Sequence, residues 1–244
     1  MQDNELEKIA AIYNLSNGKK NFEPYFHTKL ASIQICSDCK DKDVLELGCG
    51  EGLMTEDLLK ITKTLTVVEP TLYFYSMIKK KFGSNVNSNV NIYNCFLHEI
   101  ENRQRYDILI MASLLQHIKE PEELLELTKG FLRKNGMIIV TVPNVNSLHR
   151  QIGVKSGMLK NVTDDTENNK KLAQYRKFDK DLLSQLFITC GFEIVESYGY
   201  MFKPFSNEQM EKLNLDWNVI HALNEIGREN QQFANQLYIK AIIR

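Results

Sequence analysis

Short apolar runs alternate with amphipathic stretches along most of the chain. Runs such as VLEL, TVVE and MIIVTV are apolar at successive positions, which is typical of strands buried on both faces of a parallel sheet. Helical patterns separate the runs, so the order indicates strand–helix–strand crossovers and an α/β fold. We predict strands at residues 43–47, 65–69, 90–95, 107–112, 136–142, 192–198 and 236–243.

Amphipathic periodicity predicts helices before and between these strands. In the first of them, over residues 3–13, the side chains of Leu6, Ile9, Ala10 and Tyr13 share one face. The other predicted helices begin at Pro24 or cover residues 53–63, 72–82, 121–133 and 179–189.

Two segments, 144–178 and 199–235, fall outside the alternation. The first is polar and charged, and the second contains Ser206 and Gln209 at the spacing of a helix capping box. Insertions of this kind usually lie over the carboxyl ends of the strands, where α/β folds bind ligands, so we expect them to form a lid. The second insertion carries an apolar helical face at Trp217, Ile220, Leu223 and Ile226. We predict one domain over residues 1–244, with helices in 1–42, a ligand-binding core in 43–143, and the two insertions.

The composition changes this picture mainly by excluding classes of protein. The 30 basic and 31 acidic residues give a net charge of −1, whereas dedicated nucleic-acid binders usually carry a basic excess. No apolar run of about 18 residues is present, and the polar, acidic start of the chain lacks the pattern of a signal peptide. We therefore expect a cytoplasmic protein without a membrane or nucleic-acid partner.

Five scattered cysteines are expected to be reduced thiols in such a protein. Cys36 and Cys39 have the spacing of a metal-binding pair, but no second pair follows them. We interpret this pair as the end of a helix followed by a turn, and we predict no metal site.

A glycine-rich turn follows the first strand, in the sequence VLELGCGEG at 44–52. Gly48, Gly50 and Gly52 allow a tight turn and the close approach of a ligand, and the N-terminus of the next helix faces that ligand. Glu69 ends the second strand 21 residues after Gly48, where an acidic residue accepts hydrogen bonds from ribose hydroxyls. The G-x-G-x-G spacing differs from the G-x-G-x-x-G of dinucleotide sites.

Several motifs in order give the chain its resemblance to a known family. They are E-x-G-x-G-x-G at 46–52, Glu69, YDILIMASLLQHI at 106–118, LRKNGMIIVTVPN at 132–144 and LYIKAII at 237–243. With them the chain resembles the class I S-adenosylmethionine-dependent methyltransferases, in the methyltransferase type 11 group similar to ubiquinone-pathway O-methyltransferases. The resemblance implies a Rossmann-like, seven-stranded, mostly parallel sheet with an antiparallel last strand and helices on both faces. It also implies S-adenosylmethionine as the cofactor.

The resemblance assigns roles to residues of these motifs. Glu46 would face the methionine end of the cofactor, and Glu69 would bind the ribose. Relatives often carry Asp after the third strand to bind the adenine, whereas this chain has Cys95 and Phe96. Cys49 is interpreted as a small filler of the loop and not as a nucleophile. The full set implied for the cofactor is Glu46, Gly48, Cys49, Gly50, Gly52, Glu69, Pro70, Phe96, Leu97 and Ala112.

Two histidines are the candidate catalytic residues. His117 occupies the position at which relatives carry a histidine close to the substrate, and His149 lies at the start of the first insertion. Either imidazole could take the proton of a hydroxyl acceptor near neutral pH, although His117 could equally be a core or capping residue. The candidate substrate-binding residues are Tyr13, Arg150, Tyr175 and Arg176. Cations near the lid favour an acidic acceptor, which would need no base, and they are Arg150, Lys155, Arg176 and Lys177.

These observations predict an S-adenosylmethionine-dependent O-methyltransferase that acts on a small, anionic or hydroxylated metabolite. The sequence lacks the Asn/Asp-Pro-Pro-Tyr motif of amino-group methylation and the Pro-Cys pair of cytosine C5 methylation. The lid sequence PNVNSLHRQIG is similar to methyltransferases of bacterial surface-glycan pathways, including those for capsule phosphoramidate precursors. The alternatives are a tRNA-modifying methyltransferase and a non-catalytic partner subunit with the same fold. We expect a monomer or a homodimer.

Overall fold

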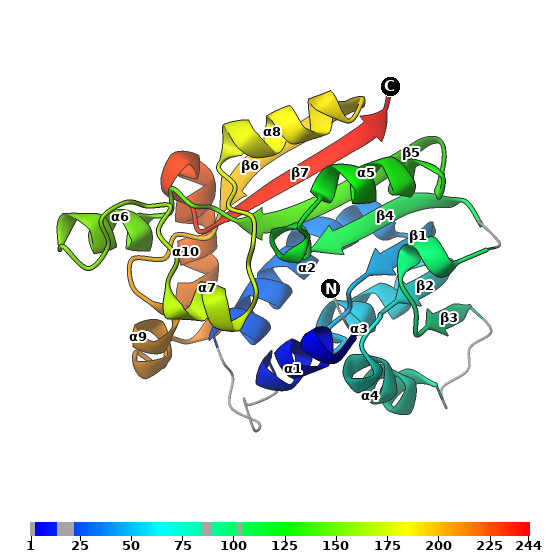
Figure 1. Cartoon of the computed structure of the whole chain (residues 1–244), viewed down its shortest axis with the longest axis horizontal. Helices are drawn as coiled ribbons and strands as arrows, with labels where there is room; N and C mark the ends of the chain where they lie inside the picture. The colour runs from blue at the N-terminus through cyan, green and yellow to red at the C-terminus, as the bar shows by residue number, and fades with distance from the viewer. Residues whose placement is uncertain (1–2, 14–21, 84–88, 102–103) are drawn as a thin grey trace.

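One seven-stranded sheet forms the centre of the protein (Figure 1). The computed structural model describes residues 3–13, 22–83, 89–101 and 104–244. The strand order is β3-β2-β1-β4-β5-β7-β6. The strands are β1 (Asp43–Leu47), β2 (Thr64–Val68), β3 (Val90–Tyr93), β4 (Tyr106–Ala112), β5 (Leu132–Pro143), β6 (Phe192–Tyr200) and β7 (Gln236–Ile243).

The predicted topology is confirmed. Strands β1 to β5 pair in parallel, and β7 runs antiparallel between β5 and β6. In β1, Glu46 pairs with Val67 of β2 and with Ile110 of β4, so it lies at the middle of the parallel part. The carboxyl ends of β1, β2 and β4 therefore meet at one edge of the sheet.

Helices cover both faces of the sheet. Alternate side chains of the central strands divide between two buried clusters, since successive strand residues point to opposite faces. Leu45 and Leu109 pack with α5 and α8, whereas Val44 and Ile108 pack with α2 and α3 (Figure 1). The helices are α1 (Asp3–Tyr13), α2 (Thr28–Cys36), α3 (Leu53–Leu59), α4 (Leu72–Phe82), α5 (Pro121–Lys129), α6 (Leu148–Lys155), α7 (Glu167–Lys171), α8 (Lys180–Thr189), α9 (Asn207–Lys212) and α10 (Trp217–Glu229).

Two helix ends differ from the sequence-based prediction. Helix α5 ends at Lys129, and not at residue 133, because the sheet takes up the following residues. The carbonyl of Phe131 accepts a hydrogen bond from the backbone N–H of Tyr106 at 2.8 Å, and Leu132 pairs with Tyr106. Helix α3 ends at Leu59 because the Ile61 carbonyl accepts a bond from the Asp41 N–H at 2.9 Å.

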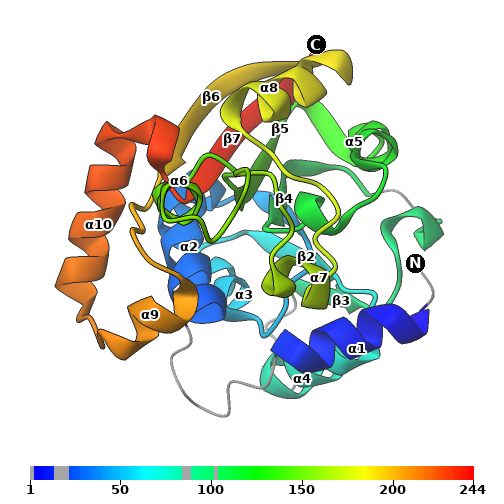
Figure 2. The same cartoon turned by 60° about the vertical axis from the view of Figure 1, so that its left-hand side comes forward.

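The two insertions lie beyond the carboxyl ends of the strands. Figure 2 shows α6 and α7 in front of the central strands, with α9 and α10 to one side. The predicted apolar face of α10 is only partly buried: Ile220 is buried, but Trp217 and Ile226 are 40% and 41% exposed. Gly227 occupies the buried side instead, because it lies against the backbone of Met201. None of the described helices is long and apolar enough to cross a membrane.

Candidate active site

A cavity of about 240 Å³ lies at the carboxyl ends of β1, β2 and β4, and we call it the strand-end cavity. The turn after β1, the residues after β2 and the end of β4 line its base. Seven of the residues predicted to hold the cofactor line it, namely Glu46, Gly48, Cys49, Gly50, Glu69, Pro70 and Ala112. The parallel topology thus brings together residues from three separate strand ends.

The glycines of the turn serve different purposes. Gly50 has a φ of +51°, and a Cβ added there would meet no atom within 4 Å, so the backbone is open to a ligand. Gly52 has a φ of +75°, and a Cβ there would lie 2.9 Å from Cε2 of Phe82 in α4. Gly52 does not line the cavity. Gly52 packs the turn against Phe82 of α4, and its predicted cofactor contact stays a prediction.

Two carboxylates are buried in the strand-end cavity. Thr55 Oγ1 donates a hydrogen bond to Glu46 Oε2 at 2.8 Å, and the backbone N–H and hydroxyl of Thr71 donate to Glu69 Oε1 at 2.9 and 2.7 Å. Burial, with a smaller contribution from the Glu69 charge, raises the pKa of Glu46 to about 7, against the effect of the Thr55 bond. Burial also raises the pKa of Glu69. The site holds a high density of acceptor oxygen atoms for a cationic or hydroxylated ligand.

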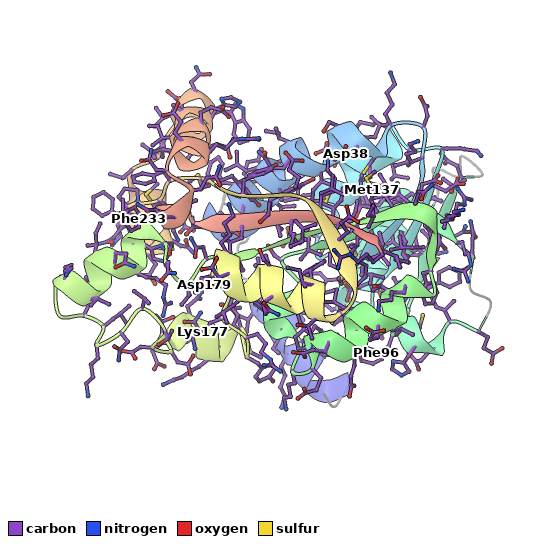
Figure 3. The ribbon with its side chains drawn as sticks, turned by 90° about the horizontal axis from the view of Figure 1, so that it is seen from above. Asp38, Phe96, Met137, Lys177, Asp179 and Phe233 are labelled. Atoms are coloured by element: carbon purple, nitrogen blue, oxygen red, sulfur yellow. The ribbon has the colours of Figure 1, made fainter. Side chains whose placement is uncertain are left out.

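Phe96 and Leu97, the predicted adenine contacts, follow β3, and their role stays a prediction. Leu97 is part of the hydrophobic core, and the Phe96 ring stacks on His98 with 5.6 Å between centroids. Neither residue lines the strand-end cavity, and Figure 3 shows Phe96 far from the insertion residue Lys177. Helix α1 closes the cavity instead, through Leu6, Ile9 and Ala10. The sequence pattern predicted the apolar face of this helix, but of that face only Tyr13 was assigned to the site.

His117 lines the strand-end cavity in a defined tautomer. Its Nδ1 lies 2.9 Å from the carbonyl oxygen of Leu172, which can only accept, so Nδ1 carries the proton. Nε2 lies 3.2 Å from the amide nitrogen of Gln116, from which it accepts a hydrogen bond. Burial lowers the pKa of His117, so its imidazole is neutral at pH 7.

A second cavity of about 610 Å³ lies between the two insertions, and we call it the insertion cavity. His149, Arg150 and Arg176 line it. Four residues line both cavities, namely His27, Gln116, Pro143 and Gln236. The two cavities are therefore neighbours that meet at the carboxyl end of β5.

Comparison with known proteins identifies the family. A family model described as a methyltransferase domain matches residues 25–197. The chain belongs to this methyltransferase family. Among curated relatives, the ubiquinone biosynthesis O-methyltransferase of Bradyrhizobium diazoefficiens is 23% identical over 178 residues, covering 72% of this chain and 68% of the relative. The enzyme of the same name from Glaesserella parasuis is 24% identical over 197 residues, covering 75% and 78%.

Solved structures show the same fold. A SAM-dependent methyltransferase from Aquifex aeolicus has a TM-score of 0.61 at 11% identity and covers 97% of this chain and 98% of its own. The plantazolicin methyltransferase, in complex with a triazolic desmethylPZN analog and SAH, has a TM-score of 0.60 at 19% identity, with coverage of 100% and 98%. S-adenosylmethionine is the cofactor of the methyltransferase described here. The open backbone at Gly50 and the buried carboxylates of the strand-end cavity fit this cationic nucleoside.

The predicted substrate-binding residues are dispersed. The guanidinium of Arg150 lines the insertion cavity but donates hydrogen bonds to the carbonyls of Val162 and Asp164, so it holds the loop between α6 and α7. Tyr175 lines neither cavity, and the Lys119 ammonium lies 5.0 Å from its ring centroid. Tyr13 ends α1, and its side chain lies outside the described part of the methyltransferase.

Three of the four predicted cations, Arg150, Arg176 and Lys177, line the insertion cavity, and each of them bonds to protein groups there. Arg176 lines it but pairs with Glu120 at 3.5 Å and with Glu122 at 3.8 Å, and Lys177 forms an ion pair with Asp165. Lys155 is exposed and outside both cavities.

Two buried basic residues of the methyltransferase were missed, His27 and Lys203. No motif marks either of them, and only the tertiary fold brings them to the insertion cavity.

Proposed function

We propose that this methyltransferase methylates an oxygen atom of a small polar molecule held in the insertion cavity. The observation that carries the proposal is the set of four residues shared by the two cavities. A molecule in the insertion cavity would lie next to the cofactor in the strand-end cavity. The volume of about 610 Å³ is ordinary for a small-molecule site. The curated relatives are named as O-methyltransferases, which supports oxygen as the accepting atom.

The residues of the strand-end cavity are assigned to the cofactor. S-adenosylmethionine supplies an activated methyl group when bound, so the protein mainly orients the acceptor and excludes water. Glu69 would hold the ribose through its carboxylate. Glu46 and the backbone at Gly48 and Gly50 would face the methionine part, and α1 would cover the ligand.

His117 is the proposed proton acceptor for a hydroxyl substrate. The Leu172 carbonyl holds the neutral imidazole in the tautomer with its lone pair on Nε2, and a substrate hydroxyl would take the place of the Gln116 amide that donates to this atom. Burial, together with the charges of Lys203, Arg150 and His27, lowers the pKa of His149 to about 2, which makes it a weak base. We therefore assign His149 to the wall of the acceptor site and not to proton transfer.

The proposed acceptor is a precursor of a bacterial surface polysaccharide. This proposal is based on the similarity of the lid sequence at 143–153 to methyltransferases of surface-glycan pathways.

The proposed function is tested by transfer of tritium from methyl-labelled S-adenosylmethionine to separate pools of small metabolites and tRNA. The control is Gly50→Arg, in which a side chain projects into the cavity. Label in small metabolites, lost in the control, is the expected result. Label in tRNA alone, or in neither pool, overturns the proposal in favour of a tRNA-modifying enzyme or a non-catalytic partner subunit.

A further inference from the structure

A lysine is buried in the wall of the insertion cavity. Lys203 lies between β6 and α9, lines the cavity and is only 3% exposed. Its ammonium group donates a hydrogen bond to Oδ1 of Asn207, at the start of α9. A buried ammonium is costly unless oxygen atoms replace its water, so an anionic ligand in the cavity would stabilise it further.

The backbone directly before this lysine is fixed by its neighbours. The Met201 carbonyl accepts a hydrogen bond from the backbone N–H of Asn235 at 2.6 Å, and the Phe202 N–H donates to the Leu223 carbonyl at 2.7 Å. These bonds join the segment to the start of β7 and to α10. The Lys203 side chain therefore extends from a rigid base, as a residue that positions a ligand must.

Two neutral imidazoles lie in the field of this lysine. Burial, and after it the positive charge of Lys203, lowers the pKa of His27 to about 3. The same two causes are the largest of those that lower the pKa of His149. The acidic residues that line the cavity, Glu167, Glu208 and Glu211, are exposed, so water and salt screen their charges more strongly. Lys203 is therefore the most deeply buried of the charged side chains that line the cavity.

We propose that Lys203 binds an anionic oxygen group of the acceptor molecule, a carboxylate or a phosphate ester, with His27 and His149 beside it. This inference rests on the proposed function, because it places the anion in the cavity assigned to the acceptor. A lysine ammonium binds either group as a compact point charge. His27 lines both cavities, so the anion would lie close to the methyl-transfer position. The acceptor is thus recognised by a buried cation, whereas Arg176 and Lys177, which also line the cavity, are partly exposed and paired with carboxylates.

The first test uses the wild-type chain saturated with S-adenosylhomocysteine. Inorganic phosphate and acetate are titrated separately, and the ring resonances of the histidines are followed by NMR. We expect saturable shifts at His27 and His149 with at least one anion, and none at His98, which is exposed and outside both cavities. The anion with the lower Kd identifies phosphate or carboxylate as the preferred group. Unshifted rings at His27 and His149 with both anions would overturn the proposal.

The second test compares variants under the same conditions. We expect Lys203→Met to weaken binding of the preferred anion at least tenfold, whereas Lys203→Arg and the matched control Lys155→Met, at an exposed lysine outside both cavities, bind it nearly as well as the wild type. Affinity for S-adenosylhomocysteine, measured by calorimetry, reports whether each variant is folded. Equal losses in Lys203→Met and Lys155→Met would contradict the assignment. Failure of methyl transfer with intact anion binding would count against the proposed function alone.

Discussion

The Glu7 carboxylate accepts a hydrogen bond from the backbone N–H of Tyr73, with 3.2 Å between Oε2 and the nitrogen. Its other oxygen accepts from the N–H of Leu72, so one side chain binds two amides in the first turn of α4. A negative charge at this end of a helix is favourable, by about 0.3–1 kcal/mol at an exposed site. The bond fastens α1 to α4 while the apolar face of α1 closes the strand-end cavity.

Substitution Glu7→Ala should loosen α1 and weaken cofactor binding. We expect the affinity for S-adenosylhomocysteine to fall about 3- to 5-fold, which corresponds to roughly 1 kcal/mol. Backbone amides of α1 should also exchange with deuterium faster. The exposed neighbour Lys8 supplies the control Lys8→Ala. Unchanged exchange in Glu7→Ala would show that the contact does not hold the helix.

The raised pKa of Glu46 predicts a pH-dependent stability. Its pKa is about 7 in the folded protein and 4.5 ordinarily, so between these values the folded chain holds a proton that the unfolded chain has released. The free energy of unfolding should therefore fall as pH rises from 4.5 to 7, by about 3 kcal/mol for this group at roughly 1.4 kcal/mol per pKa unit. Urea titrations of Glu46→Gln should show a flatter profile over that window. A variant as steep as the wild type would contradict the assignment.

The substitutions Gly50→Ala and Gly52→Ala should have different effects on thermal stability and on cofactor affinity. Both have positive φ, which costs an alanine on the order of 1 kcal/mol. Gly52→Ala also places a methyl group against Phe82, so we expect the larger loss in Tm there. Gly50→Ala has no protein atom to meet, and its methyl group would instead reduce the room for the cofactor. Calorimetry with S-adenosylhomocysteine should show the larger affinity loss for Gly50→Ala, and the reverse order would reject this division of roles.

Removal of His117 should lower kcat more than it changes KM for a hydroxyl acceptor. General-base catalysis contributes typically 10²–10⁴-fold, so His117→Ala should lose about that factor. The exposed His98 gives the matched control His98→Ala. Steady-state assays over pH 6 to 9 would measure both parameters. A His117→Ala enzyme within about twofold of the wild type would indicate an acceptor that reacts as an anion.

Arg150 should stabilise the first insertion. Its bonds to the Val162 and Asp164 carbonyls are partly buried, and Arg150→Ala leaves both acceptors without their donor. We expect faster limited proteolysis between Lys160 and Lys171, where the wild type is already accessible. Arg176→Ala, which affects ion pairs at the surface, should be cleaved at the wild-type rate. Equal cleavage of the wild type and Arg150→Ala would show that the loop is held by other contacts.

The sheet followed from the sequence because its strands have a strong local pattern. Runs such as DVLEL, which is buried at every position, are short, and a glycine turn follows this one directly, so length and flanking residues favour a strand over a helix. The boundary between α5 and β5 was harder, since Phe131 and Leu132 are apolar residues that also fit a helical period. Their assignment depends on Tyr106, a strand away, which local sequence does not reveal.

The part of the candidate site formed by the glycine turn could be predicted from the sequence. The part formed by tertiary packing of distant segments could not. The glycine turn follows β1 and Glu69 follows β2. Because these two strands are parallel neighbours, the number of residues between the turn and Glu69 can be recognised in the sequence. His27 and Lys203 meet at the insertion cavity from distant parts of the chain. Phe96 was expected at the adenine, but the stacking of its ring on His98 depends on the turn after β3.

The border between the two cavities has a consequence for how this enzyme could diversify. Four residues from four segments form it, and beyond them the insertion cavity is built mainly from residues 144–177 and 203–211. Mutations in those two segments would alter the shape and charge offered to an acceptor while leaving the cofactor half intact. Acceptor preference is thus a modular trait, and an exchange of both insertions between relatives should transfer it in a single step.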